Sequence, residues 1–315
     1  MIKYLMELIN LYNPCKLCPR ICGVNRLAKE IGICGETSKL RIATAVIHKG
    51  EEPPLVGTGG SGTIFVSGCN LGCSFCQNYQ VSQGNEYNIS LGKAVSAEEF
   101  ANICAALQDK GAENINIVTG SHAVPGLIEG FIAARKIGVN LPILWNSSGY
   151  DSIHTLELLK DYIDIYLPDL KTLDSEIAAK FFNAPDYPEI ATKAILKMTN
   201  NTQDKAKVIV RHLVLPGFLD STRSVLKWFA DNVKTRALLS LMTQYTPIEH
   251  SPNSNREMPN RYLSEDEYNT VLEWLEEFKI EDGFCQELVT GSSWLPDFKK
   301  HNPFSSELSV PVWHF

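Results

Sequence analysis

The sequence has no long apolar run and no excess of basic charge. No stretch approaches the roughly 20 consecutive apolar residues that a membrane-spanning helix requires, and the first residues lack the small-residue cleavage site of a secretion signal. The 29 Lys and Arg residues are outweighed by 36 Asp and Glu residues, which gives a formal net charge of −7. We therefore expect no membrane partner and no nucleic-acid partner, because broad nucleic-acid binding needs a basic face.

The chain also lacks the cysteine pattern of a disulfide framework. Its nine cysteines are an odd number, and seven of them cluster at the spacings of metal ligands. This pattern is typical of metal sites in a reducing compartment, so we expect a cytoplasmic protein. The other two, Cys104 on the apolar face of an expected helix and Cys285 beside Phe284, are predicted to be buried core thiols.

The middle of the chain alternates strand-like and helix-like segments. We expect strands at 63–67, 114–119, 142–146, 163–167, 207–215 and 238–244, and helices at 97–110, 125–137, 153–160, 174–182, 187–198, 221–234 and 265–278. Such alternation predicts an α/β fold with a mostly parallel sheet covered by helices. Six strands are too few for a closed eight-stranded barrel, so we predict a partial (β/α)6 TIM-like barrel.

Three parts of the chain differ in composition. We predict a small N-terminal Cys-rich metal-binding segment at 1–50, the barrel core at 55–248, and a C-terminal extension of loop, helix and aromatic residues at 249–315. The polar stretch 250–261 is long for a connector and is expected to form a loop or lid. The tail from 287 onward is rich in aromatic residues, which are expected to pack across the open side of the barrel.

Three cysteines follow the first expected strand at the spacing C-x3-C-x2-C: Cys69, Cys73 and Cys76. Three thiolates on one loop can hold three irons of a [4Fe–4S] cluster and leave the fourth iron open to a substrate or cofactor. The alternative is a zinc knuckle with a distant fourth ligand. The position after a strand, the spacing and Phe75 before the third cysteine favour the cluster.

This loop resembles the signature loop of the radical S-adenosylmethionine (SAM) enzymes. The resemblance implies a partial barrel, a [4Fe–4S] cluster whose open iron binds the amino and carboxylate groups of SAM, and Phe75 near the adenine. It also implies reductive cleavage of SAM to a 5′-deoxyadenosyl radical that takes a hydrogen atom from a substrate. Such an enzyme needs an electron donor of the flavodoxin or ferredoxin type.

Polar residues follow the other expected strands, at the edge where parallel sheets bind ligands. Arg211 or Lys171 would pair with the SAM carboxylate. Asn146, Ser147 and Ser148 would bond to its ribose or methionyl end. For Arg211 the alternative is a buried ion pair with Asp169. The sequence assigns no general acid or base.

Four N-terminal cysteines, Cys15, Cys18, Cys22 and Cys34, form a separate group among prolines and glycines. Turns at those residues can bring four thiolates together. The segment has too few apolar residues to fold on burial alone, so we expect a metal to stabilise it. A structural zinc ion and an auxiliary [4Fe–4S] cluster both fit. The auxiliary cluster is favoured, because it could exchange electrons with the cluster at Cys69, Cys73 and Cys76.

Nearly the whole chain resembles the PflX-type homologues of pyruvate formate-lyase activating enzymes. The resemblance rests on the runs 15–26, 59–65, 68–79, 146–149, 169–171, 210–217 and 294–298. Two positions depart from related enzymes: Gly120-Ser121-His122 stands where many carry Gly-Gly-Glu, and Asn146 where the better-known activases carry an acidic residue.

Three functions fit these observations. The first is an activase that removes a Cα hydrogen from a glycine of a partner glycyl-radical enzyme. The second is radical SAM modification of a peptide or small metabolite. The third is a non-catalytic iron–sulfur or zinc protein, which the three-cysteine loop disfavours because an electron carrier does not need an open iron.

Overall fold

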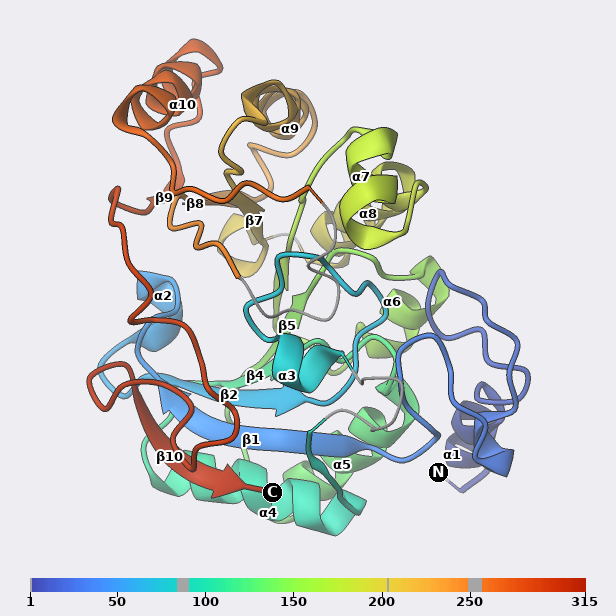
Figure 1. Ribbon diagram of the computed structural model, residues 1–315. Coiled ribbons are helices and arrows are strands. Elements are labelled where there is room, and N and C mark those ends of the chain that lie inside the picture. The colour runs from blue at the N-terminus through green and yellow to red at the C-terminus, as the bar shows by residue number, and fades with distance from the viewer. Residues whose placement is uncertain (1, 84–90, 203, 249–256) are drawn as a thin grey trace.

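The computed structural model describes residues 2–83, 91–202, 204–248 and 257–315 (Figure 1). Its core is a run of parallel strands in chain order. One sheet contains β2 (Ser61–Val66), β4 (Ile115–Val118), β5 (Ile143–Ser147) and β6 (Ile165–Pro168), and a second contains β7 (Ile209–Leu213) and β8 (Leu238–Met242). Parallel bridges from Tyr166 to Val208 and from Asp169 to Arg211 join β6 to β7. The predicted α/β fold is therefore confirmed, with all six expected strands in the order of an open barrel.

Helices follow these strands close to where the periodicity places them. They are α4 (Ala97–Asp109), α5 (Val124–Lys136), α6 (Ile153–Leu159), α7 (Ser175–Phe182), α8 (Tyr187–Asn201), α9 (Leu219–Asn232) and α10 (Glu265–Glu277). The start of α4 is fixed by a capping box, in which Ser96 accepts from the Glu99 amide and Glu99 accepts from the Ser96 amide. The same device starts α10 at Ser264 and Glu267.

Strand β1 (Arg41–His48) was not expected. It lies inside the segment assigned to the N-terminal metal-binding part, yet it pairs antiparallel with β2 and with β10 (Ser309–His314). Its six central residues are buried, so it belongs to the main sheet. The remaining short elements are α1 (Ile2–Asn10), α2 (Pro53–Val56), α3 (Tyr79–Ser82), β3 (Lys93–Ala94) and β9 (Gly283–Cys285), with 3-10 turns at Arg26–Ala28 and Lys205–Lys207.

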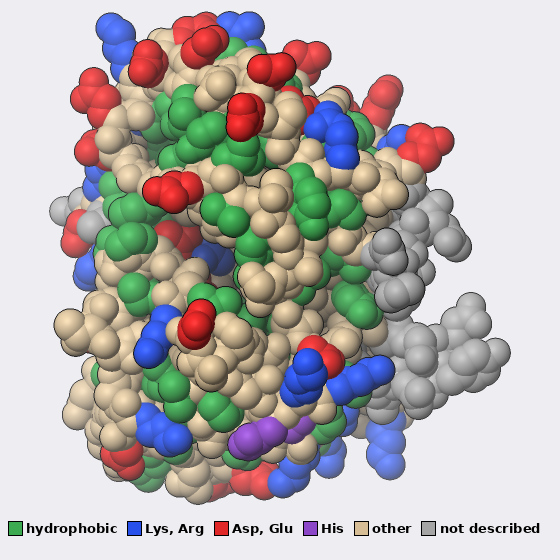
Figure 2. All heavy atoms as spheres, turned by 60° about the vertical axis from the view of Figure 1, so that its left-hand side comes forward, with side chains coloured by type: hydrophobic (Ala, Val, Ile, Leu, Met, Phe, Trp, Pro, Cys, Tyr) green, Lys and Arg blue, Asp and Glu red, His purple; other side chains and the backbone are tan. Residues whose placement is uncertain are grey.

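The C-terminal segment connects the two sheets. Strand β9 pairs with β8 at the edge of one sheet and β10 pairs with β1 at the edge of the other, so residues 286–308 pass from one edge to the other (Figure 1). Phe298 is fully buried, with its ring 5.0 Å from that of Phe65. On the side of the molecule shown in Figure 2, acidic and basic side chains are interspersed with hydrophobic ones.

Three further expectations concern the cysteines, the polar loop and membranes. Cys104 is buried as predicted, but Cys285 is exposed, because β9 lies at the edge of its sheet. Most of the polar stretch predicted at 250–261 lies outside the described residues. In the described part of the chain, no helix has the length and apolar character needed to cross a bilayer.

Candidate active site

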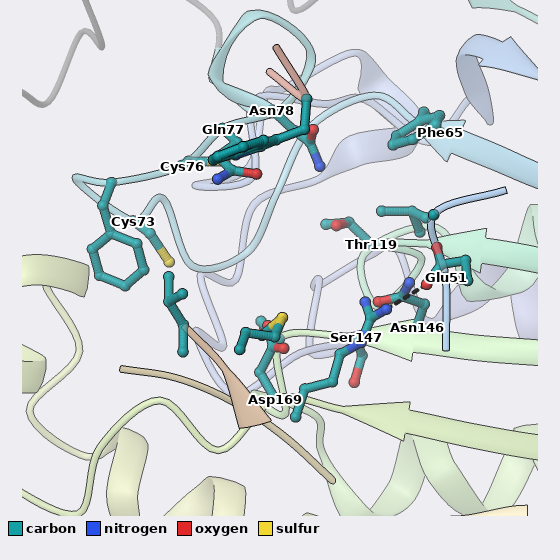
Figure 3. A pocket seen from close by; sticks show the side chains of 18 of the residues that line it. Glu51, Phe65, Cys73, Cys76, Gln77, Asn78, Thr119, Asn146, Ser147 and Asp169 are labelled. Atoms are coloured by element: carbon teal, nitrogen blue, oxygen red, sulfur yellow. Dashed lines mark hydrogen bonds and ion pairs between the residues drawn. The ribbon is translucent and has the colours of Figure 1, made fainter. Parts of the chain in front are cut away.

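A cavity of about 310 Å³ lies at the carboxyl ends of the parallel strands. It is lined by all nine of the residues predicted around the first cluster: Cys69, Cys73, Phe75, Cys76, Asn146, Ser147, Ser148, Lys171 and Arg211. Cys73 and Cys76 approach it from one side, and Glu51 and Asn146 lie on the opposite side (Figure 3). The fold therefore brings together residues that are up to about 140 positions apart in the sequence.

Backbone contacts fix the cysteine loop after β2. Gly68 has φ +83°, and a Cβ there would lie 2.7 Å from the carbonyl oxygen of Cys34, so only glycine fits. The Cys69 amide donates to that same carbonyl at 3.2 Å. The Ser74 amide donates to Phe181 at the end of α7, at 2.9 Å. The loop is thus held by the N-terminal segment on one side and by α7 on the other.

The three thiols are suited to a metal cluster in number and in chemistry. Burial raises the pKa of Cys76 to about 11, the neighbouring Cys69 adds to this, and burial also raises the pKa of Cys73. Because iron binds thiolates, cluster assembly must release these protons. In the ranges that the structure describes, no three His, Cys, Asp or Glu side chains are already placed as ligands of one metal ion.

Lys171 lies beside the cysteine loop and pairs with Asp169. Its Nζ is 2.5 Å from the Asp169 carboxylate and 5.9 Å from the centre of the Phe75 ring. Burial acts to lower the pKa of Lys171, but the Asp169 carboxylate outweighs it, and the pKa is raised above its ordinary value. A cation and an anion therefore stand together at the cavity wall, both mostly buried.

Arg211 lines the cavity as predicted, but its ion-pair partners are not the predicted one. Its guanidinium pairs with Glu52 at 2.6 and 2.8 Å and with Glu51, and Asp169 pairs with Lys171 instead. The ion pair with Asp169 expected as the alternative for Arg211 is therefore wrong, and the contact of Arg211 with a SAM carboxylate stays a prediction. The two glutamates were missed because they lie just before the expected barrel and about 160 residues from their partner.

The polar run at the end of β5 contains buried and accessible residues. The Ser147 hydroxyl donates to Asp151 at 2.6 Å, and Ser121 donates to the other carboxylate oxygen of Asp151 at 2.6 Å. Burial raises the pKa of Asp151 and the two hydroxyls act to lower it. The Asn146 amide makes no side-chain hydrogen bond within the described part of the chain, so Asn146 is the member of this run whose amide can bind a ligand in the cavity.

A family model described as the Radical SAM superfamily matches residues 63–229, which is more than half of the chain. The chain is 30% identical over 280 residues to an uncharacterised protein of Methanocaldococcus jannaschii, covering 86% of this chain and 77% of that protein. It is 26% identical over 193 residues to the pyruvate formate-lyase-activating enzyme of Clostridium pasteurianum, covering 58% of this chain and 73% of that enzyme.

A solved structure supports the fold. A radical SAM methyltransferase from Sphaerobacter thermophilus superposes with a TM-score of 0.51 at 16% identity, over 72% of this chain and 66% of that one. The chain spans 46% of Streptococcus suis SuiB bound to precursor peptide SuiA, at 14% identity and a TM-score of 0.48 over 70% of this chain. Since the family model spans the C-x3-C-x2-C loop and the strand ends that face it, the chain belongs to the radical SAM superfamily, whose members are enzymes that use a [4Fe–4S] cluster and SAM.

Proposed function

We propose that this chain cleaves SAM reductively at a [4Fe–4S] cluster held by Cys69, Cys73 and Cys76 and uses the product radical to take a hydrogen atom from a substrate. The observation that carries the proposal is the convergence of three thiols and polar strand ends on one cavity. When bound, such a cluster supplies the electron that splits SAM into methionine and a 5′-deoxyadenosyl radical. The protein contributes orientation and exclusion of water.

The residues around the cavity suit the parts of SAM. The methionyl end of SAM is a zwitterion, and the Lys171–Asp169 pair offers it one charge of each sign. Asn146 and Ser148 provide donors and acceptors for hydroxyl groups. Phe75, whose ring lies beside Lys171 and 5.7 Å from Phe182, provides an apolar surface for the adenine.

The substrate class that we propose is a glycine within a partner protein. The likeness to a pyruvate formate-lyase-activating enzyme over 58% of this chain supports it, as does the resemblance of the strand-end runs to such activases. The Cα hydrogen of glycine is the atom that the radical would take, leaving 5′-deoxyadenosine and a glycyl radical.

Cys73→Ala tests the chemistry. Anaerobically reconstituted protein should produce 5′-deoxyadenosine from SAM when reduced with dithionite, and Cys73→Ala should abolish this product because one iron loses its ligand. Cys285→Ala is the matched control, since Cys285 is an exposed thiol outside the cavity. Production at the wild-type rate by Cys73→Ala would show that the site is assigned wrongly.

Deuterium transfer tests the substrate. A glycyl-radical enzyme encoded by a neighbouring gene, labelled with [2-²H]glycine, should pass deuterium to 5′-deoxyadenosine and acquire the electron paramagnetic resonance signal of a glycyl radical. Unlabelled 5′-deoxyadenosine and no protein radical would contradict the substrate class and leave the SAM chemistry standing.

A further inference from the structure

We propose that Cys15, Cys18, Cys22 and Cys34 bind a second [4Fe–4S] cluster, and that an acidic one-electron carrier protein docks beside it to reduce it. The inference deepens the proposed function and rests on it, since the electron that enters here is the one that SAM cleavage consumes. The sequence alone left zinc and iron–sulfur open at these cysteines, and four features of the structure favour the cluster and its role.

The first feature is the convergence of the four thiols. Cys15, Cys18 and Cys34 are buried and Cys22 is partly exposed. A Cβ added to Gly32 would lie 3.3 Å from the Cys34 sulfur and 3.5 Å from the Cys22 sulfur, so these two sulfurs flank one point. The Ile21 amide donates to the Cys18 carbonyl and the Gly23 amide donates to the Cys15 carbonyl, both at 3.1 Å, so Cys15, Cys18 and Cys22 lie on one tight turn.

The second feature is a buried cation beside these thiols. Arg26 is 1% exposed, and its guanidinium lies 3.8 Å from the Cys15 sulfur and 4.6 Å from the Tyr12 ring centre. It also donates to the carbonyls of Thr37 and His122, at 3.0 and 2.7 Å. Carbonyls and thiols are neutral, whereas a buried charge needs an opposite charge. Four thiolates around a metal centre supply that negative charge.

The third feature joins this segment to the catalytic loop. The carbonyl of Cys34 accepts the amide of Cys69 at 3.2 Å, so a ligand of one centre is hydrogen-bonded to a ligand of the other. Arg20, between Cys18 and Cys22, donates to the carbonyls of Asn70 and Leu71 at 2.8 and 3.1 Å. A zinc ion has no redox chemistry and could not pass an electron to the neighbouring centre. An iron–sulfur cluster could pass one, and we therefore assign iron.

The fourth feature is the surface around the four cysteines. Ile21, which is 62% exposed, precedes Cys22, and Ile33, which is 63% exposed, precedes Cys34; Leu27 and Ile31 between them are also exposed. Exposed apolar residues with charged neighbours are typical of protein interaction sites. This surface therefore suits a docking protein.

The charge of the segment indicates which kind of protein docks there. Among the side chains of residues 15–39 that are not buried, four are basic (Lys16, Arg20, Lys29 and Lys39) and one is acidic (Glu30), in a chain whose net charge is −7. A local positive charge on an acidic protein attracts an acidic partner and orients it. A reduced carrier of the flavodoxin or ferredoxin type would lose one electron and the N-terminal centre would gain it, with no bond formed or broken.

Iron counting tests the metal. In a variant with Cys69, Cys73 and Cys76 all replaced by Ala, reconstituted protein should retain about four irons and show an electron paramagnetic resonance signal after reduction. Zinc alone, or no metal, would overturn the proposal. The count does not depend on SAM cleavage, so this proposal and the proposed function can fail separately.

Binding of an acidic flavodoxin, followed by isothermal titration calorimetry, tests the surface. Ile33→Glu should weaken binding about tenfold, and Ile137→Glu, at the end of α5 and 53% exposed, is the matched control. Ile21→Gly is a second variant that the fold should tolerate, because Ile21 has φ +42°, where glycine is favoured. Unchanged iron content checks the fold of both variants, and wild-type affinity in both would overturn the docking surface.

Discussion

Arg211 lies in the wall of the cavity, and its guanidinium neutralises two buried carboxylates, Glu51 and Glu52. Arg211→Ala should lower the free energy of unfolding by about 3–5 kcal/mol, because it leaves buried charges without a partner. Urea denaturation measures the loss. The SAM affinity of the same variant tests separately the predicted contact of Arg211 with the SAM carboxylate.

Arg223→Ala is the matched control for that experiment. Arg223 pairs with Glu277, but both side chains are about half exposed, and exposed pairs contribute at most about 1 kcal/mol. Adding Glu52→Gln to Arg211→Ala should recover part of the stability, since it removes one of the stranded charges. Equal losses for Arg211→Ala and Arg223→Ala would contradict the assignment of Arg211 as a partner of buried charge.

The role of a residue could be predicted where it follows from spacing within a short segment. It could not be predicted where it depends on contacts with residues far away in the sequence. The cysteine loop could be predicted because three ligands and an aromatic residue lie within eight positions. The environment of Arg211 could not, because its partners come from the segment before the barrel. Cys285 was wrongly expected to be buried, since an apolar neighbour in sequence does not show whether a strand lies at an edge.

At the scale of elements, His212 of β7 links the end of β6 to α9. Its Nδ1 donates to Leu170 at 2.7 Å and its Nε2 accepts from the Thr222 hydroxyl at 3.0 Å. Burial lowers the pKa of His212 to about 4, while Asp169 and Lys171 act on it in opposite directions. The folded protein therefore keeps this imidazole neutral at a pH where the unfolded chain is already protonated.

Because the pKa of His212 is lower in the folded protein than in the unfolded chain, the free energy of unfolding decreases as the pH falls. The stability contributed by neutral His212 is fully present above pH 6.5, and it is lost as the pH falls from about 6.5 to about 4, by about 3 kcal/mol in total. Urea titrations from pH 7 to pH 4 measure it. His212→Asn should flatten the slope, whereas His301→Asn, at an exposed position, should leave it unchanged.

The C-terminal segment stabilises the barrel through Phe298. This side chain is fully buried against Phe65, and its backbone amide donates to Gln80 of α3 at 2.6 Å. Phe298→Ala should reduce the free energy of unfolding by about 3–5 kcal/mol through the lost contacts and the cavity left behind. Phe315→Ala, at a residue 41% exposed, should have little effect. If guanidinium denaturation gave the same midpoint for both variants, Phe298 would not be a core contact.

The elements that follow a repeated pattern could be predicted, and β1 could not. Alternating strands and helices identify the parallel strands because each unit has the same apolar periodicity. Strand β1 is antiparallel and outside that repeat, and its partner β10 lies some 270 positions later, with Thr44 opposite His314. Because the four cysteines at positions 15–34 precede it, residues 1–50 were predicted as a single metal-binding segment.

At the scale of the molecule, Arg20 joins the N-terminal segment to the barrel. It donates to the carbonyls of Asn70 and Leu71 in the cysteine loop, and to those of Phe182 and Asn183 at the end of α7. Carbonyls that lose a charged donor and remain buried cost roughly 1–3 kcal/mol each. The N-terminal segment therefore holds the catalytic loop in place through the Arg20 side chain and through the carbonyl of Cys34, which accepts from the Cys69 amide.

Arg20→Ala should loosen the catalytic loop without unfolding the barrel. We expect amide hydrogen exchange over residues 69–76 to rise about tenfold to a hundredfold, because hydrogen bonds to a charged group contribute roughly 1.5–3 kcal/mol. Arg135→Ala is the matched control, since Arg135 also donates to two carbonyls, of Val139 and Leu141, but at the far end of α5. Its exchange changes should be confined to that helix end. Unchanged exchange over residues 69–76 in Arg20→Ala would show that the catalytic loop is held by the barrel alone.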